Sequence, residues 1–278
     1  MPDDRIETVF ERKGCPIHYW TGGPEGHPLV VLLHGACVDH RSFAFQWPVL
    51  TQNYRVLTLD VRGHGLSQPM GRPFSILLAV EDVLEIIDRL GYKEAVFVGH
   101  SNGTYIAQEL VFRLPERVTA LVIADGTCIT WTHSAFENWL VRSSTSWMAL
   151  FPWESLKKSS LPWVSARQEV RDYTYSAYSM LTKAGFLAIW RGATECLHPE
   201  PGYHIRKPWL LVHGAQDRMG DIKKIAARWA ANEPNCQYTV IPDAYHFAIL
   251  DNPTFFNRLL LDFLAKWAPV EAVSTAAR

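Results

Sequence analysis

The chain has 278 residues, of which 48% are hydrophobic and 20% charged, as is ordinary for a globular protein. Its formal net charge of -1 at pH 7 offers no basic surface, so we expect no nucleic-acid partner. No hydrophobic run approaches the roughly eighteen residues of a membrane helix, and no hydrophobic stretch follows the polar N-terminus, Met1 to Arg5. We therefore expect a cytoplasmic protein without a signal peptide or a membrane span.

The five cysteines are odd in number, widely scattered and without a C-x-x-C pair; they are Cys15, Cys37, Cys128, Cys196 and Cys236. This pattern argues against a disulfide framework or a zinc site and suits a reducing compartment. No metal-ligand cluster and no G-x-G-x-x-G motif after a strand is seen either, so the sequence predicts no metal and no cofactor.

Short hydrophobic runs in the first third of the chain predict strands. Residues 6–12 and 16–21, joined by Lys13-Gly14, are typical of an antiparallel hairpin at a sheet edge. Residues 29–33 and 55–59 are continuous hydrophobic runs, too short for helices, which indicates strands buried on both faces. Residues 74–90 have hydrophobic side chains at helical spacing and stop at Gly91, a usual helix end.

The same alternation continues further along the chain, with an interruption. A strand ending at Gly99 runs into a helix over 104–110, and residues 120–124 form another strand. Residues 126–206 then lack a clear strand and hold six of the eleven tryptophans: Trp131, Trp139, Trp147, Trp153, Trp163 and Trp190. We expect this segment to be a helical insertion above the carboxyl edge of the sheet.

The sheet resumes after the insertion. Strands are predicted over 209–212 and 237–241, helices over 222–231 and 253–267, and a frayed tail over 270–278. Strands that alternate with helices imply a parallel, doubly wound sheet. The predicted fold class is therefore α/β, with a core formed by residues 1–125 and 207–278 and a helical cap formed by residues 126–206.

The segment from Gly99 to Gly103 reads Gly-His-Ser-Asn-Gly and joins a predicted strand directly to a predicted helix. In such a nucleophile elbow the turn strains the backbone of the serine, and the flanking positions need glycine. The motif predicts that Ser101 projects its hydroxyl at the carboxyl end of the sheet. The pattern alone is weak, because about one match arises by chance in every ten chains of this length. An ordinary loop serine is the alternative.

A serine hydroxyl becomes a nucleophile when an imidazole, held by a carboxylate, removes its proton. Asp217 and His246 each follow a late predicted strand, and the chain order Ser, Asp, His is that of one known triad arrangement. We therefore interpret His246 as the general base and Asp217 as the acid. Three other carboxylates stay open as the acid: Asp125, the chief rival, together with Asp221 and Asp243.

A carbonyl substrate also needs donors for the negative charge on its oxygen. The elbow offers the backbone N–H of Asn102, the residue after the serine. The second donor should come from the loop after the strand over 29–33, where Ala36 is best placed and Cys37 is next.

Five ordered motifs resemble those of the α/β-hydrolase superfamily along nearly the whole chain. They are His34-Gly35-Ala36, the segment from Asp60 to Ser67 (DVRGHGLS), Gly99 to Gly103, the segment from His213 to Asp217 (HGAQD) and Ala244-Tyr245-His246-Phe247. The resemblance implies a Ser101/Asp217/His246 triad, an Ala36/Asn102 oxyanion hole and an inserted cap. It also implies structural roles for Arg62 and His64.

Two details qualify the resemblance. Serine stands at the elbow where the family's dehalogenases and epoxide hydrolases carry aspartate, which disfavours those two reactions. Met219-Gly220 follows Asp217 where relatives often place proline or valine, so the chain departs from the family pattern beside the predicted acid.

The aromatic insertion suggests an apolar pocket, so the expected partner is a small to medium apolar carboxylic ester, cleaved through an acyl-enzyme. The pocket residues that we predict are Gly35, Cys37, His100, Trp131, Trp147 and Phe247. The tryptophans could equally form the core of the cap itself. Lactone opening, carbon–carbon hydrolysis and perhydrolysis use the same triad, and a small-molecule receptor is the alternative from another class. The sequence leaves monomer and dimer equally open.

Overall fold

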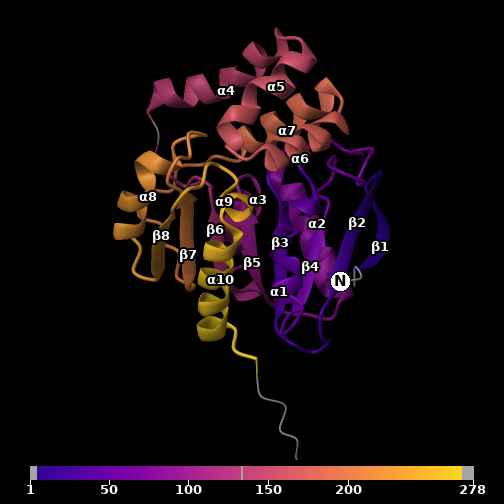
Figure 1. The fold of residues 1–278 in the computed structure, drawn as a ribbon, viewed down its shortest axis with the longest axis vertical. Coiled ribbons are helices and arrows are strands. Elements are labelled where there is room, and N and C mark those ends of the chain that lie inside the picture. The colour runs from indigo at the N-terminus through magenta and orange to yellow at the C-terminus, as the bar shows by residue number, and fades with distance from the viewer. Residues whose placement is uncertain (1–4, 133, 271–278) are drawn as a thin grey trace, which may run out of the picture.

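The computed structural model describes residues 5–132 and 134–270, so the predicted frayed tail lies, beyond Val270, outside the described residues. Eight strands form one sheet, and helices pack on both of its faces (Figure 1). The strands are β1 (Ile6–Arg12), β2 (Cys15–Gly22), β3 (Leu29–Leu33), β4 (Arg55–Leu59), β5 (Ala95–His100), β6 (Val118–Ala124), β7 (Trp209–Gly214) and β8 (Cys236–Ile241).

The helices of the core alternate with these strands, as the sequence predicts. They are the 3-10 helices η1 (His40–Phe43) and η2 (Pro115–Arg117), and the α-helices α1 (Trp47–Leu50), α2 (Ile76–Arg89), α3 (Gly103–Arg113), α8 (Ile222–Ala231), α9 (Ala248–Asp251) and α10 (Pro253–Trp267). None of the helices in the described residues is both long and apolar enough to cross a membrane.

The strand order is β1-β2-β4-β3-β5-β6-β7-β8, with β1 and β2 antiparallel and the strands from β3 to β8 parallel. This confirms the predicted mostly parallel sheet and its edge hairpin. In the register of the centre, Leu33 pairs with Gly99 and His100 pairs with Ala124. The loops that leave these strands therefore begin side by side at one edge of the sheet, where ligands of such sheets bind.

Among the described residues, four helices lie between β6 and β7 in the chain and stand above that edge in Figure 1. These cap helices are α4 (Ala135–Ala149), α5 (Trp153–Val164), α6 (Gln168–Ser179) and α7 (Lys183–Glu195). A capping box between Ser134 and Glu137 starts α4. The indole N–H of Trp190 on α7 donates to Ser144 Oγ on α4 over 2.8 Å, which ties these two helices together.

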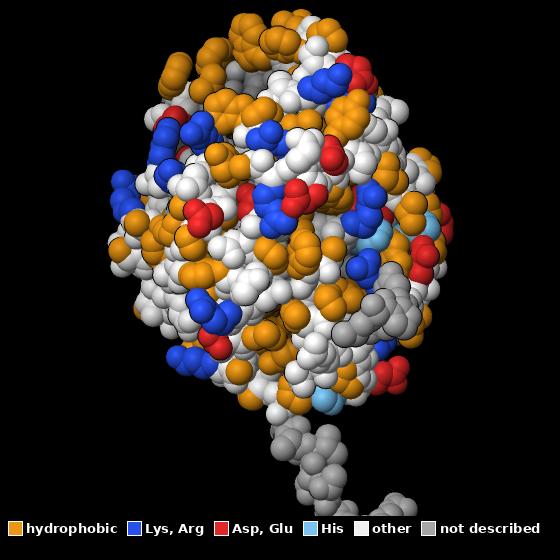
Figure 2. Space-filling model, viewed as in Figure 1, with side chains coloured by type: hydrophobic (Ala, Val, Ile, Leu, Met, Phe, Trp, Pro, Cys, Tyr) orange, Lys and Arg blue, Asp and Glu red, His pale blue; other side chains and the backbone are white. Residues whose placement is uncertain are grey.

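Half of the six tryptophans in this region lie on the outer surface. Trp139, Trp147 and Trp163 are 57%, 57% and 47% exposed. Figure 2 shows hydrophobic side chains gathered along the top of the molecule, over α4. These three side chains therefore neither form the core of the cap nor line an enclosed pocket.

A buried ion pair joins the loop after β4 to α2. Arg62 Nε and Nη2 donate to the two carboxylate oxygens of Asp82 over 2.6 Å each, and both side chains are almost completely buried. Two parallel charge-assisted hydrogen bonds fix the loop geometrically as well as energetically. This contact matches the structural role that the resemblance implies for Arg62.

We predict that Asp82→Ala destabilises the protein by about 3–5 kcal/mol, because the guanidinium of Arg62 is left buried without its counter-charge. Urea unfolding followed by circular dichroism measures the change. The double variant Arg62→Met/Asp82→Leu should lose less than Asp82→Ala alone, since it removes both charges. A cost below about 1 kcal/mol for the single variant would show that the pair does not hold the loop.

Candidate active site

The serine of the G-x-S-x-G motif occupies a strained turn between β5 and α3. Ser101 has a φ of 49°, in the left-handed region that side chains seldom adopt. A Cβ atom on Gly103 would lie 2.0 Å from the carbonyl oxygen of Leu33, and one on Gly99 would lie 2.6 Å from the backbone nitrogen of Thr104. Both glycines are thus required sterically, and the chain forms the elbow geometry that the motif predicts.

The three side chains of the predicted triad lie in one hydrogen-bonded line. His246 Nε2 is 2.8 Å from Ser101 Oγ, and His246 Nδ1 is 3.0 Å from Asp217 Oδ2. The other carboxylate oxygen, Asp217 Oδ1, accepts the backbone N–H of Met219 over 2.8 Å. Met219, which stands where relatives often have proline or valine, therefore still donates a hydrogen bond to Asp217.

Asp125, the chief rival for the acid, has different partners. Its Oδ1 accepts the N–H of Gly214 over 2.8 Å and its Oδ2 accepts the N–H of Ala248 over 3.0 Å. Burial, together with the nearby charge of Asp217, raises the pKa of the Asp125 carboxyl well above its usual range. Asp125 thus joins the end of β7 to the start of α9, and it is Asp217 that bonds to His246.

Asp217, and neither of the two remaining rivals, is the carboxylate 3.0 Å from His246 Nδ1. Asp221 precedes the first residue of α8, and Asp243 occupies an exposed turn after β8 with a φ of 55°. The sequence analysis favours Asp217 but leaves Asp221 and Asp243 open, because they too follow late strands.

The loop after β3 passes directly against the serine. A Cβ atom on Gly35 would lie 3.2 Å from Ser101 Cβ. Among the described residues, no protein acceptor engages the backbone N–H of Ala36 or of Asn102. Both N–H groups therefore stay available to an incoming atom. Cys37 follows with a φ of 65° and a buried side chain, so this loop is strained as well.

His34 fixes the orientation of this loop, a role that the sequence analysis missed. His34 Nδ1 lies 2.8 Å from the carbonyl oxygen of Gly35, and His34 Nε2 lies 2.9 Å from the N–H of Val61. Complete burial lowers the pKa of His34, so the neutral ring donates from Nδ1 and accepts at Nε2. Because C=O and N–H point in opposite directions in a trans peptide, this bond turns the N–H of Ala36 away from His34.

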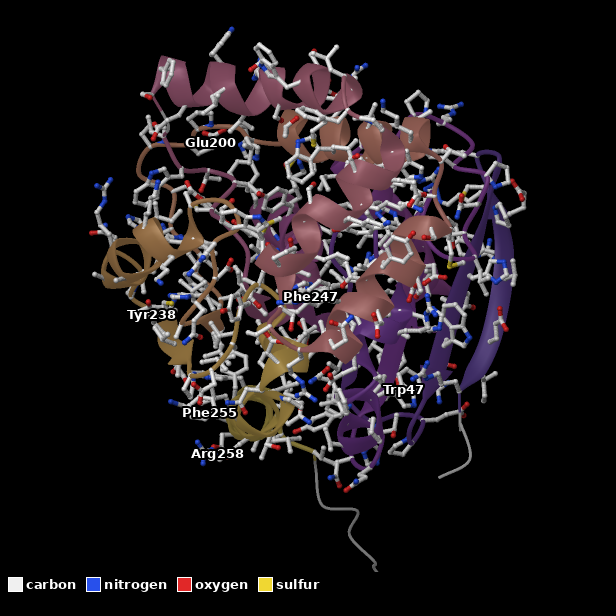
Figure 3. All side chains as sticks on the ribbon, turned by 45° about the horizontal axis from the view of Figure 1, so that its top comes forward. Trp47, Glu200, Tyr238, Phe247, Phe255 and Arg258 are labelled. Carbon is white, nitrogen blue, oxygen red and sulfur yellow. The ribbon has the colours of Figure 1, made fainter. Side chains whose placement is uncertain are left out.

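His100, predicted as a pocket residue, is only 1% exposed and faces the protein interior. Its Nε2 lies 2.8 Å from the carbonyl oxygen of His246, and burial lowers its pKa to about 3. The neutral ring therefore donates this hydrogen bond and holds the backbone of His246. Phe247, labelled in Figure 3, packs against His100 with ring centroids 4.4 Å apart and ring planes tilted by 33°, and it meets Tyr173 of α6 edge to face at 6.3 Å.

Two tryptophans that the sequence assigned to the pocket lie elsewhere. Trp131 lines a cleft of about 270 Å³ between the segments that connect core and cap, and the guanidinium of Arg228 stacks 4.5 Å from its ring centroid. Trp147 points outward from α4. No described contact joins either side chain to Ser101. Composition revealed an aromatic region but not which face of each helix its side chains occupy.

One group of potential metal ligands lies beside the loop after β3. Ligand atoms of Asp39, His40 and Asp60 lie within 4.8 Å of one another. Protein donors already engage them: His40 Nδ1 is 2.8 Å from Asp60 Oδ1, and Arg41 Nη2 donates to Asp39 Oδ2 over 2.6 Å. We therefore interpret this group as an internal ion-pair network. All five cysteines have free thiols.

The sequence profile of the Alpha/beta hydrolase family matches residues 30–259. The chain belongs to this family. The match confirms the resemblance to α/β-hydrolases that the five motifs indicate. It also agrees with the predicted α/β fold class.

Individual relatives of this alpha/beta hydrolase are distant. Epoxide hydrolase 4 of Homo sapiens is 25% identical over 90% of this chain and 76% of its own length. A solved thermophilic esterase from Thermogutta terrifontis superposes with a TM-score of 0.80 at 20% identity, over 96% of this chain and all of its own. The enol-lactonase from Burkholderia xenovorans gives a TM-score of 0.80 at 24% identity, covering 93% and 100% of the two chains. The solved structures agree in fold.

Burial lowers the pKa of His64, as it does for His34 and His100. His64 is 1% exposed, its Nδ1 lies 3.0 Å from the carbonyl oxygen of Val61, and its pKa falls to about 3. In the unfolded chain an imidazole takes up a proton near pH 6.5. Between pH 6.5 and about 3 the unfolded state therefore binds more protons than the folded state, and acid favours unfolding.

We predict that His64→Asn, which keeps a donor near the position of Nδ1, reduces the loss of stability on acidification. Between pH 7 and pH 5 the unfolding free energy of this variant should fall by about 2 kcal/mol less than that of the native chain. Urea unfolding at the two pH values measures the difference. Equal losses in the two proteins would contradict the buried neutral state of His64.

Proposed function

We propose that the protein is a serine hydrolase that cleaves carboxylic esters of small to medium apolar substrates. The observation that carries this proposal is the line from Ser101 Oγ through the imidazole of His246 to Asp217, with distances of 2.8 and 3.0 Å. We further propose that residues 126–206 act as a cap on a core of residues 1–125 and 207–278, and that the protein works in the cytoplasm.

In the proposed mechanism His246 Nε2 removes the hydroxyl proton of Ser101 while Oγ attacks the carbonyl carbon of the ester. The N–H groups of Ala36 and Asn102 stabilise the negative charge that develops on the carbonyl oxygen. The tetrahedral species collapses to an acyl-enzyme, and the leaving alkoxide takes the proton from His246. Asp217 stabilises the imidazolium in between. Water then attacks the acyl-enzyme by the same steps, with His246 as the base, and the carboxylic acid product is released.

The nature of the nucleophile guides the choice among the activities named for the relatives. Those names include an epoxide hydrolase, an esterase and an enol-lactonase. A serine at residue 101 supports acyl transfer from an ester or a lactone, since the resemblance links epoxide opening to aspartate at this position. Lactone opening is therefore the nearest alternative, and carbon–carbon cleavage uses the same residues.

We predict that Ser101→Ala lowers kcat for hydrolysis of p-nitrophenyl butyrate at least 1,000-fold, because the acyl acceptor is removed. Release of nitrophenol measures the rate, and circular dichroism shows whether the variant stays folded. Styrene oxide, tested in parallel, should not be opened. Full activity of the folded variant would refute the mechanism, and single-turnover hydrolysis by the native chain would favour a receptor.

A second pair of variants tests which carboxylate is the acid. Asp217→Asn should lower kcat about 10,000-fold, because the imidazolium loses its counter-charge and the ring its correct tautomer. Asp125→Asn removes one acceptor of a backbone N–H instead, so it should lower the unfolding free energy while kcat falls less than 10-fold. The opposite ranking of the two kcat values would move the acid to Asp125.

A further inference from the structure

The backbone around His246 is held on both sides of the residue. Tyr245, which precedes it, donates its N–H to Asp251 Oδ2 over 2.7 Å. Phe247, which follows it, donates its N–H to the carbonyl oxygen of Val164 over 3.0 Å. The carbonyl oxygen of His246 itself accepts a hydrogen bond from His100 Nε2. The backbone is therefore held at three consecutive residues, 245 to 247.

Two of these three contacts lead into the cap. Val164 is the last residue of α5. Asp251 lies in α9 and is 8% exposed, and its second oxygen, Oδ1, accepts the hydroxyl of Ser165, which is completely buried. The hydroxyl oxygen of Ser165 accepts in turn the N–H of Arg167 over 2.9 Å. A short cap segment therefore holds the loop of His246 through buried hydrogen bonds.

Two arginine side chains add hydrogen bonds to this contact between the cap and α9. Arg167 Nη1 donates to the carbonyl oxygens of Asp251, over 3.1 Å, and of Leu250, over 3.3 Å. Arg171 Nε donates to the carbonyl oxygen of Ser165 over 2.6 Å. Val164, Ser165 and Arg167 thus engage the loop and helix around His246 by backbone, hydroxyl and guanidinium groups, and Arg171 holds Ser165 within the cap. We name these residues the cap clamp.

We propose that Ser165 and Arg167 are positioning residues for the base, acting through Asp251 and the peptide of Tyr245 to keep the His246 ring within hydrogen-bond reach of Ser101. This inference rests on the proposed function. On this proposal the cap also positions the base, in addition to covering the site. Neither residue was singled out by the sequence motifs, which place the whole catalytic constellation in the core.

The physical reason is the burial of the Asp251 carboxylate. A buried carboxylate needs donors at both oxygens, because the loss of one leaves a desolvated acceptor without a partner. Without the Ser165 hydroxyl, the carboxylate is expected to turn toward other donors and to release the N–H of Tyr245. A displacement of about 1 Å at a catalytic group can cost about 100-fold in rate.

The clamp also limits how the cap can open. A cap that lifted as one body would break the contacts of residues 164–171 with the loop and free His246. We therefore expect this end of the cap to stay in place during turnover.

The test compares two serine-to-alanine variants inside the cap. Ser165→Ala should lower kcat for p-nitrophenyl butyrate at least 10-fold with KM within about 2-fold, because the site still binds but the base is misplaced. Ser165→Thr, which restores a hydroxyl, should regain most of kcat. The matched control is Ser144→Ala, which loses the hydrogen bond from Trp190 within the cap and touches no residue near His246. Its kcat should stay within 2-fold.

A second readout separates this inference from the proposed function. Phosphonylation of Ser101 by a fluorophosphonate requires the base but no natural substrate, and intact mass spectrometry follows its rate. The rate should fall at least 10-fold in Ser165→Ala and remain native in Ser144→Ala. A native chain that hydrolyses no ester would refute the proposed function, and the labelling rates would still decide on the clamp. Equal rates for both variants, or a native rate for Ser165→Ala, would overturn the clamp.

Arg167, a half-buried member of the clamp, provides a second variant whose side chain is partly solvated. Arg167→Met keeps the aliphatic stem but removes the donors to residues 250 and 251, so kcat and the labelling rate should both fall 3-fold or more. Its control is Glu169→Gln, which removes the ion pair between Glu169 and Arg167 Nη2 without touching the loop of His246. If Glu169→Gln matches Arg167→Met in both rates, the donors to the loop are not what positions the base.

Discussion

The hydrogen bond between Ser101 and His246 joins residues 145 positions apart in the chain, and the rest of the structure is arranged so that it can form. Parallel strands present their carboxyl ends at one edge of the sheet, so the loops after β5, β7 and β8 begin side by side there. The strained turn at Ser101 lifts its side chain above that edge. A slip of the register by one residue would shift one loop against the next by about 3.3 Å, more than a hydrogen bond tolerates.

Neutral, buried histidines give this edge its rigidity. His34 orients the loop that carries Ala36, and His100 holds the carbonyl oxygen of His246. Each ring is neutral because burial lowers its pKa, and its hydrogen-bond partners set which nitrogen donates. The two buried carboxyl groups near His246 also have different partners. Asp217 bonds to the His246 ring, while Asp125 accepts two backbone N–H groups. Side chains of the same type thus have distinct tasks set by their partners.

The relatives of this alpha/beta hydrolase include proteins named for epoxide, ester and lactone chemistry, all with one fold. The chemistry of such proteins depends on the residues grafted on the sheet edge. In this chain the helical segment between β6 and β7 adds to that edge, because Val164, Ser165 and Arg167 bond to the loop of His246 and to α9. Under the proposed function, this segment therefore contacts the loop that carries the base.

The sequence by itself determined the strands of the sheet and the elbow at Ser101, because hydrophobic periodicity and the steric demand for glycine act within single segments. Only the tertiary structure decided which of four carboxylates bonds to His246, which tryptophans face solvent, and that Ser165 of the cap reaches Asp251. These outcomes depend on distances of about 3 Å between groups that lie far apart in the chain. No local pattern of residues encodes such a distance.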